Sequence, residues 1–194
     1  MSLRRIVGFL SGLMVIAVAL LVASTSASAQ GKEQTEFVVA WALPADAPPD
    51  TEVRTEVFRT LRQAAYVATG GAILLEDDAT FADLARELQS LERTLGRSSF
   101  AETTIGIDYD GANYSSGGYI WTVSNSVGCS TGTTYSVSSM PSGWNDRVSS
   151  AQAFGGCNTF VHYANTGLGG DSITCTCSSM GTMNNRTSSE RWAP

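Results

Sequence analysis

Apolar residues recur with a helical period in two stretches of the first half of the chain. The first stretch contains four apolar residues at four-residue spacing: Val53, Val57, Leu61 and Ala65. This spacing puts their side chains on one face of a helix. Residues 44–49 are rich in proline, whose fixed backbone angles favour an extended linker. We therefore expect a helix that begins at Asp50 or Thr51, whose side chains can cap it, and ends at Gly70.

The second stretch carries leucines at helical spacing: Leu84, Leu88, Leu91 and Leu95. Thr80 and Asp83 approximate a capping box at its start, and Gly96 supplies a stop signal at its end. The leucines predict a buried helix face. Residues 30–102 thus form an expected α-helical segment, either a pro-region or a helical hairpin, and no motif in it performs chemistry.

Residues 103–194 follow another pattern, in which short apolar stretches alternate with turns rich in Gly, Ser, Thr and Asn. Sequences of this kind are typical of β-strands joined by tight turns. Two hairpins are expected, each with a glycine-containing turn: residues 105–109 with 119–123, and residues 158–163 with 171–176. The composition changes near residue 102, so we expect residues 103–194 to fold alone as an all-β domain.

A repeat lies within this second half. Residues 138–150, SSMPSGWNDRVSS, recur as residues 178–189, SSMGTMNNRTSS, with one residue deleted and an offset of 39 positions. A repeat of this length indicates one supersecondary unit used twice. Each copy follows one of the two hairpins, so each unit supplies four antiparallel strands, the last of which begins at the Ser-Ser end of the motif. This arrangement predicts two Greek keys packed as a sandwich.

The ends of the repeat resemble a known motif. NDRVSS, residues 145–150, and NNRTSS, residues 184–189, match the calcium motif of microbial βγ-crystallin domains, which is Asn/Asp, Asn/Asp, two free positions, Ser/Thr and Ser. Tyr163 and Gly170 also fit the aromatic-then-glycine spacing of that family's folded hairpin. Residues 103–193 therefore resemble a βγ-crystallin sandwich of two Greek keys.

The resemblance implies calcium ions shared between the two loops. Because each loop of the family supplies ligands to both ions, it implies these positions: Asn145, Asp146, Arg147, Ser149, Asn184, Asn185, Arg186 and Ser188. The second and fifth positions would ligate through side chains and the arginines through backbone carbonyls. The arginine side chains cannot bind a cation, and we expect them to stack or to bond carbonyls.

Calcium prefers hard oxygen ligands such as those of Asn, Asp and Ser. Among the side chains implied as ligands, only Asp146 is charged. A low ligand charge implies the weak affinity of extracellular modules, about 10⁻⁴ to 10⁻³ M, and a structural rather than a signalling ion. The alternative is a pair of metal-free turns in which Asn and Ser bond the backbone.

The N-terminal end predicts export. Arg4 and Arg5 precede an apolar run, residues 6–23, which is followed by the A-x-A sequence of residues 27–29. This is the pattern of a signal peptide, so we assign residues 1–29 to one and expect a secreted, extracellular protein, with a retained anchor as the alternative. Cleavage would lower the formal charge from -6 to -8. A chain this acidic is not suited to bind nucleic acid or an anionic membrane.

Four cysteines in an exported chain predict two disulfides. The expected register of the second hairpin puts Cys157 beside Cys175 and Cys177, so we expect Cys157 to bond one of them and Cys129 the other. A bond between Cys175 and Cys177 is not expected, because strand residues two apart lie about 6.6 Å apart. Export and the lack of a C-x-x-C pair argue against a zinc site built from these cysteines.

The sequence favours a protein without enzymatic activity. His162 is the only histidine, and we expect it on a strand surface, in alternation with Phe160 and Tyr163. No nucleophile elbow or paired-carboxylate motif surrounds it.

Among bacterial secreted proteins of the resembled fold, the chain is most similar to small peptidase inhibitors typified by an actinobacterial inhibitor of metalloproteinases. The two loops carry that similarity, which implies an inhibitor of an extracellular metallopeptidase. Two alternatives are a calcium-stabilised binding or surface module without inhibitory activity and a killer-toxin-like antimicrobial protein.

Overall fold

The computed structural model describes residues 36–48, 51–95, 101–125 and 127–194. The expected signal peptide, residues 1–29, lies outside the described residues, and so does Gly96. Within the described part of the chain, no helix has the length and hydropathy that crossing a bilayer requires.

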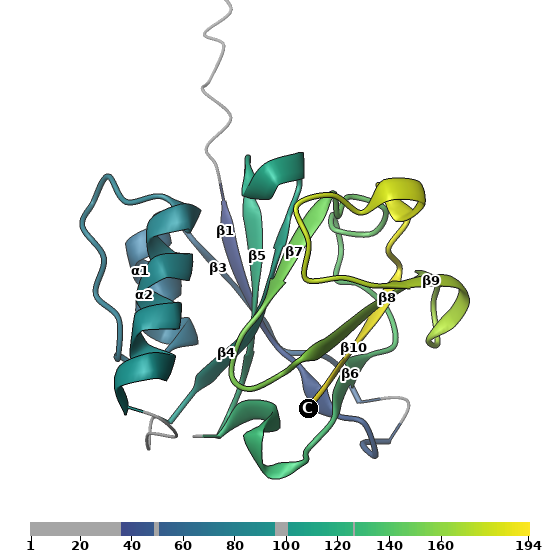
Figure 1. Ribbon diagram of the computed structural model, residues 1–194, viewed down its shortest axis with the longest axis horizontal. Helices are drawn as coiled ribbons and strands as arrows, with labels where there is room; N and C mark the ends of the chain where they lie inside the picture. Colours follow the sequence, from purple (N-terminus) through teal and green to yellow (C-terminus); the bar gives the residue numbers. More distant parts are fainter. Residues whose placement is uncertain (1–35, 49–50, 96–100, 126) are drawn as a thin grey trace, which may run out of the picture. The chain divides into compact units, whose positions relative to one another are not determined.

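Two five-stranded sheets make up most of the fold (Figure 1). Sheet A has the order β3 (Thr55–Phe58), β1 (Phe37–Trp41), β5 (Gly118–Val123), β4 (Thr103–Tyr109) and β7 (Ser150–Ala153). Sheet B has the order β2 (Leu43–Pro44), β6 (Tyr135–Val137), β10 (Ser189–Ala193), β8 (Thr159–Asn165) and β9 (Gly169–Thr174). Neighbouring strands are antiparallel except β1 and β5, which are parallel. The expectation of a mainly β protein is confirmed.

Both expected hairpins are present, since β4 pairs with β5 and β8 pairs with β9. The Ser-Ser ends of the two repeats begin β7 at Ser150 and β10 at Ser189, as the repeat predicts. The register of the second hairpin differs from the expected one. The expected register, which placed Cys157 opposite Thr176, would put Tyr163 opposite Gly170. Tyr163 instead lies opposite Ser172, and the register shifts between this pair and the Asn165–Gly169 pair at the turn.

Each repeat is divided between the two sheets. β6 follows β5 in the chain but lies in sheet B, between β2 and β10. Conversely, Cys177 follows β9 of sheet B but pairs with Ala151 of β7 in sheet A. The Ala151 N–H donates to the Cys177 carbonyl at 3.1 Å, and the Cys177 N–H donates to the Ala151 carbonyl at 2.8 Å. Neither sheet is therefore built from one repeat alone.

The N-terminal segment also supplies strands, not only helices. β1 and β3 extend sheet A, and β2 extends sheet B. The expected helix is wrong over Thr55–Phe58, which pairs with β1 as a strand and leaves Val57 58% exposed. The pairing with β1 satisfies the backbone of this stretch, so the helix α1 (Leu61–Ala68) begins only where Thr60 caps it by accepting from the Gln63 N–H at 3.2 Å.

The second expected helix is confirmed as α2 (Phe81–Leu95). Its capping box is formed: the Thr80 N–H donates to Asp83 Oδ2 at 2.8 Å, and the Asp83 N–H donates to Thr80 Oγ1 at 3.3 Å. Leu84 and Leu88 are buried, as the leucine stripe predicts. Three short 3₁₀ helices complete the described structure: η1 (Ala112–Tyr114), η2 (Gly128–Thr131) and η3 (Gly181–Met183).

Apolar layers cover both faces of sheet A. Along β5, Trp121 joins a cluster shared with sheet B, whereas its neighbour Ile120 joins a cluster shared with α1 and α2. Successive strand residues point to opposite faces, which explains this division. The helix-side cluster combines Leu61 and Leu84 with Ile107 of β4. The change of composition near residue 102 therefore does not coincide with a break in the packing.

Candidate functional site

The two motif loops pair with each other and have the same backbone shape. Asp146 and Asn185, the second motif positions, both adopt the left-handed conformation, with φ angles of 59° and 55°. The Asp146 N–H donates to the Thr187 carbonyl at 3.0 Å, and the Asn185 N–H donates to the Val148 carbonyl at 3.0 Å. Each loop thus holds the other through equivalent backbone hydrogen bonds.

The side chains expected as ligands meet in two crossed pairs. Ser149 Oγ donates to Asn185 Oδ1 at 3.0 Å, and Ser188 Oγ donates to Asp146 Oδ1 at 3.4 Å. Both serines are nearly buried, whereas Asp146 and Asn185 are exposed. The fifth motif position of each loop therefore lies against the second position of the other.

The remaining motif residues surround these pairs. Asn145 and Asn184 are exposed, and Asn145 Nδ2 donates to Asp146 Oδ2 at 2.8 Å. The arginine side chains each bond a loop carbonyl and a carboxylate: Arg147 to Gly143 O (2.8 Å) and Asp110 Oδ2 (2.6 Å), and Arg186 to Thr182 O (3.2 Å) and Asp171 Oδ2 (2.8 Å). Arg147 also lies 4.9 Å from the centre of the Trp144 ring. The expectation that these side chains stack or bond carbonyls is confirmed.

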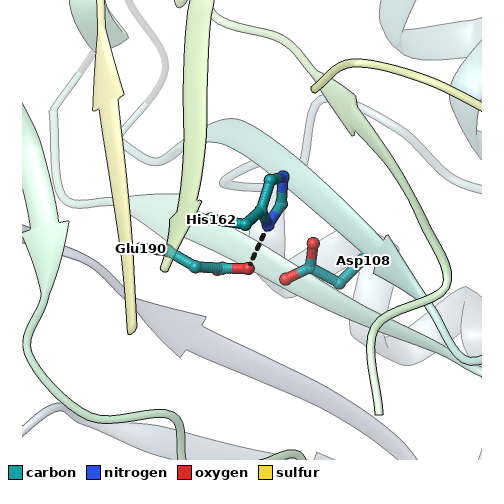
Figure 2. A group of neighbouring side chains, drawn as sticks. All are labelled: Asp108, His162 and Glu190. Carbon is teal, nitrogen blue, oxygen red and sulfur yellow. Dashed lines mark hydrogen bonds and ion pairs between the residues drawn. The ribbon is translucent and has the colours of Figure 1, made fainter. Parts of the chain in front are cut away.

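A second group of polar side chains lies between the two sheets. Asp108 of β4 faces His162 of β8 and Glu190 of β10 (Figure 2). All three side chains are 0% exposed. One side-chain atom from each residue, a ring nitrogen of His162 or a carboxyl oxygen of Asp108 or Glu190, lies within 4.8 Å of the other two. We call these three residues the buried cluster, which joins sheet A to sheet B.

Hydrogen bonds fix how the buried cluster presents its atoms. His162 Nε2 lies 3.2 Å from the Cys175 carbonyl, which can only accept, so Nε2 carries a proton. His162 Nδ1 lies 2.8 Å from Glu190 Oε1, directly across the β8–β10 pair. On sheet A, Trp121 Nε1 donates to Asp108 Oδ2 at 2.7 Å. The other oxygens, Asp108 Oδ1 and Glu190 Oε2, are buried and have no partner among the described residues.

Burial controls the protonation of the buried cluster. Burial raises the pKa of Glu190 to about 8, and the neighbouring polar groups of Asp108 and Trp121 reduce that rise. Burial, together with the charge of Glu190, raises the pKa of Asp108 well above its usual range. Burial lowers the pKa of His162, and the negative charge of Asp108 partly offsets this effect. Burial thus favours the uncharged forms of these groups, and a neutral His162 with its proton on Nε2 accepts at Nδ1 from the Glu190 carboxyl.

The sequence prediction placed His162 on a strand surface, and that prediction is wrong. β8 turns Phe160 and His162 to the same buried side, because alternate strand residues face the same way. The two-residue spacing from Phe160 was the available signal. Asp108 and Glu190 come from strands far apart in the chain, and only the packing of the two sheets brings them together.

All four cysteines form disulfides, as expected, but the expected pairing is wrong. Cys129 bonds Cys157, with α-carbons 4.9 Å apart, and Cys175 bonds Cys177, with α-carbons 5.1 Å apart. The prediction assumed an extended strand through both cysteines of the second pair. β9 instead ends at Thr174, and the chain then crosses from sheet B to sheet A, which shortens the distance between them.

No protein-family model matches this chain, and the searches of curated proteins and of solved structures gave no match. The paired loops and the buried cluster therefore carry the functional assignment.

Proposed function

We propose that this chain is an extracellular calcium-stabilised module of the βγ-crystallin type, in which the paired loops hold the ions. The crossed contacts, Ser149 with Asn185 and Ser188 with Asp146, support this proposal most directly. The resemblance implies that each ion draws ligands from both loops. In each crossed contact, the serine hydroxyl of one loop and the Asn185 or Asp146 side-chain oxygen of the other loop lie within hydrogen-bond distance.

The arrangement of the strands is compatible with two Greek keys. In a Greek key the fourth strand returns to lie beside the first. β7 lies beside β4, and β10 lies beside β8, so the last strand of each repeat pairs with the first strand of its own hairpin. The remaining strand of the first repeat, β6, lies in the opposite sheet. This exchange gives the two repeats one shared core.

The loop chemistry suits a hard cation bound at the surface. Carboxylate, amide and hydroxyl oxygens are ligands that calcium accepts at relaxed geometry. Asp146 and Asn185 are exposed, so an ion bound there can exchange with solvent. Because each proposed ion contacts both loops, its role would be to stabilise the association of the two repeats.

The first test is thermal unfolding of the whole chain in calcium, in magnesium and in chelator. A ligand that binds only the folded state stabilises it by about 2.7 kcal/mol at a hundredfold excess over its dissociation constant. We expect calcium to raise the melting temperature, and magnesium to raise it less because it demands a smaller octahedral shell. Identical melting curves in calcium and in chelator would identify the loops as metal-free turns.

Variants then locate the ions. Asp146→Ala should reduce the calcium-induced shift most, because it removes the only charged side chain proposed as a ligand. Ser188→Ala should weaken the same ion, and a double-mutant cycle between Asp146 and Ser188 should show coupling of the calcium shift. Asp78→Ala removes an exposed carboxylate outside the loops and is the matched control. Independent effects of the two loop variants would contradict the shared ion.

Inhibition of an extracellular peptidase is carried by the resemblance alone and stays a prediction. A stoichiometric complex with a secreted metallopeptidase would support it. Growth arrest of cells without such a complex would favour the antimicrobial alternative instead.

A further inference from the structure

We propose that Asp108, His162 and Glu190 form a second metal site, distinct from the calcium loops, that takes a divalent transition ion such as zinc. The site lies in the interior between the two sheets, and each of its residues is fully buried. This proposal does not rest on the calcium loops, which use exposed residues at the surface.

The histidine is set up as a nitrogen ligand. The Nε2 proton of His162 is donated to the Cys175 carbonyl, so the lone pair of Nδ1 points toward the Glu190 carboxyl group, beside which Asp108 lies (Figure 2). A ligating histidine commonly donates its other ring N–H to a carbonyl or carboxylate, which fixes the tautomer. The Cys175 carbonyl supplies that contact for His162.

Each of the two carboxyl groups has one buried oxygen without a hydrogen-bond partner among the described residues. Trp121 donates to Asp108 Oδ2, and Asp108 Oδ1 is buried with no hydrogen-bond partner among the described residues. Glu190 Oε2 has no partner among the described residues. A buried polar atom without a partner is costly, because it has lost its hydration and gained nothing in return. A cation between these oxygens removes that cost.

Charge balance favours a dication. An ion that binds here displaces the protons of the two carboxyl groups into solvent. The two carboxylates and the neutral imidazole then carry a charge of −2, which an ion of charge +2 cancels. A neutral assembly avoids the large penalty of placing net charge in the apolar interior. The neighbouring indoles of Trp121 and Trp192 bring no charge of their own, so the balance is set by the cluster itself.

The donor set and spacing select the kind of ion. A nitrogen with carboxylate oxygens suits zinc and related first-row ions, whereas calcium prefers more ligands and oxygen alone. Zinc bonds of about 2.0–2.2 Å place tetrahedral ligands about 3.3–3.6 Å apart. The three donor atoms lie within 4.8 Å of one another, so small side-chain movements suffice. Because the cluster is sealed from solvent, the ion would join the sheets structurally and enter during folding.

The test refolds the disulfide-intact, denatured full chain in zinc chloride or in chelator. The product is desalted with a weak chelator to remove surface ions, and its metal content and melting temperature are measured. We expect stoichiometric zinc and a higher melting temperature after refolding in zinc. Wild-type protein that refolds in zinc without retaining the ion, and melts as it does in chelator, would overturn the proposal.

Conservative variants assign the ion to the cluster. Asp108→Asn and Glu190→Gln keep side-chain size and hydrogen bonding but remove a charge, so each should lose the retained zinc. Asp146→Ala should keep it, which separates this site from the calcium loops. Cobalt in place of zinc adds a spectroscopic readout, since a bound cobalt ion gives visible absorption bands that depend on its ligands. Zinc retained equally by both cluster variants would show that the ion binds elsewhere and would refute the proposal.

Discussion

At the scale of single residues, the aromatic side chains packed against Gly106 leave no room for a side chain at that position. Gly106 lies on β4, two residues before Asp108, and a β-carbon built there would lie 2.7 Å from Trp192 Nε1 and 3.2 Å from the Phe160 ring. The Phe160 and Trp192 rings are stacked with centroids 4.8 Å apart, so neither can move freely. Glycine is therefore required at this position by packing and not by backbone conformation.

Gly106→Ala should destabilise the protein by about 1–3 kcal/mol, because overpacking a filled core forces neighbouring side chains from their preferred positions. Urea unfolding of the purified variant measures the change. The control is Gly117→Ala, where an added β-carbon has no atom within 4 Å and should have little effect. Equal stability of the two variants would show that the aromatic stack yields to the extra methyl group.

At the scale of elements, the two disulfides have different structural roles. The Cys129–Cys157 bond ties η2, in the connection from β5 to β6, to the connection from β7 to β8, with a separation of 28 positions. The Cys175–Cys177 bond lies within one crossing segment, with a separation of 2 positions. Only the first bond joins segments that are distant along the chain.

Removing the Cys129–Cys157 bond by paired Cys→Ala changes should cost about 3.5 kcal/mol, whereas removing Cys175–Cys177 in the same way should cost about 1 kcal/mol. The difference arises because a longer closed loop restricts the unfolded chain more strongly. Chemical unfolding of the two variants provides the comparison, and peptide mapping without reduction checks the pairing. A larger loss from the 175–177 variant would contradict this explanation.

At the scale of the whole molecule, the N-terminal segment completes the fold instead of standing apart from it. β1 pairs with β5 over residues 38–41 and 119–122, and α1 and α2 cover the outer face of sheet A. Ile107, Ile120 and Phe154 of the second half are buried on that face. Without residues 36–102 they would be exposed, together with the unpaired edge of β5.

Residues 103–194 expressed alone should therefore fail to unfold cooperatively, contrary to the expectation from composition. The exposed apolar face and the free edge of β5 should also favour aggregation. Calorimetry or near-ultraviolet circular dichroism on heating tests this, with a chain that begins at Gln34 as the matched control. A sharp transition in the shorter fragment would show that the sheets and their shared core suffice.

The local features of this fold could be predicted from the sequence, whereas the features that depend on residues distant in the chain could not. The capping box of Thr80 and Asp83 and the turns of both hairpins are encoded within a few residues, so pattern and spacing were sufficient to predict them. The strand Thr55–Phe58 was missed because its partner β1 determines its conformation, and apolar spacing alone suggested a helix. Propensity and periodicity yield to tertiary pairing in such cases.

The candidate sites divide in the same way. The family resemblance, and not a local pattern, implied that the fifth position of one loop lies near the second position of the other, and Ser149 does contact Asn185. Calcium binding by these residues stays a prediction. The buried cluster has no local signal, because its members come from three strands in two sheets. The pairing of Cys175 with Cys177 was missed for a related reason: it depends on where β9 ends and the chain crosses to the other sheet.

The place of β10 in sheet B has a consequence for the order of folding. β10 follows every other strand in the chain, yet it lies between β6 and β8 and carries Glu190. Synthesis proceeds from the N-terminus, so β6 and β8 emerge long before the strand that separates them. Sheet B therefore cannot close until synthesis has passed residue 193.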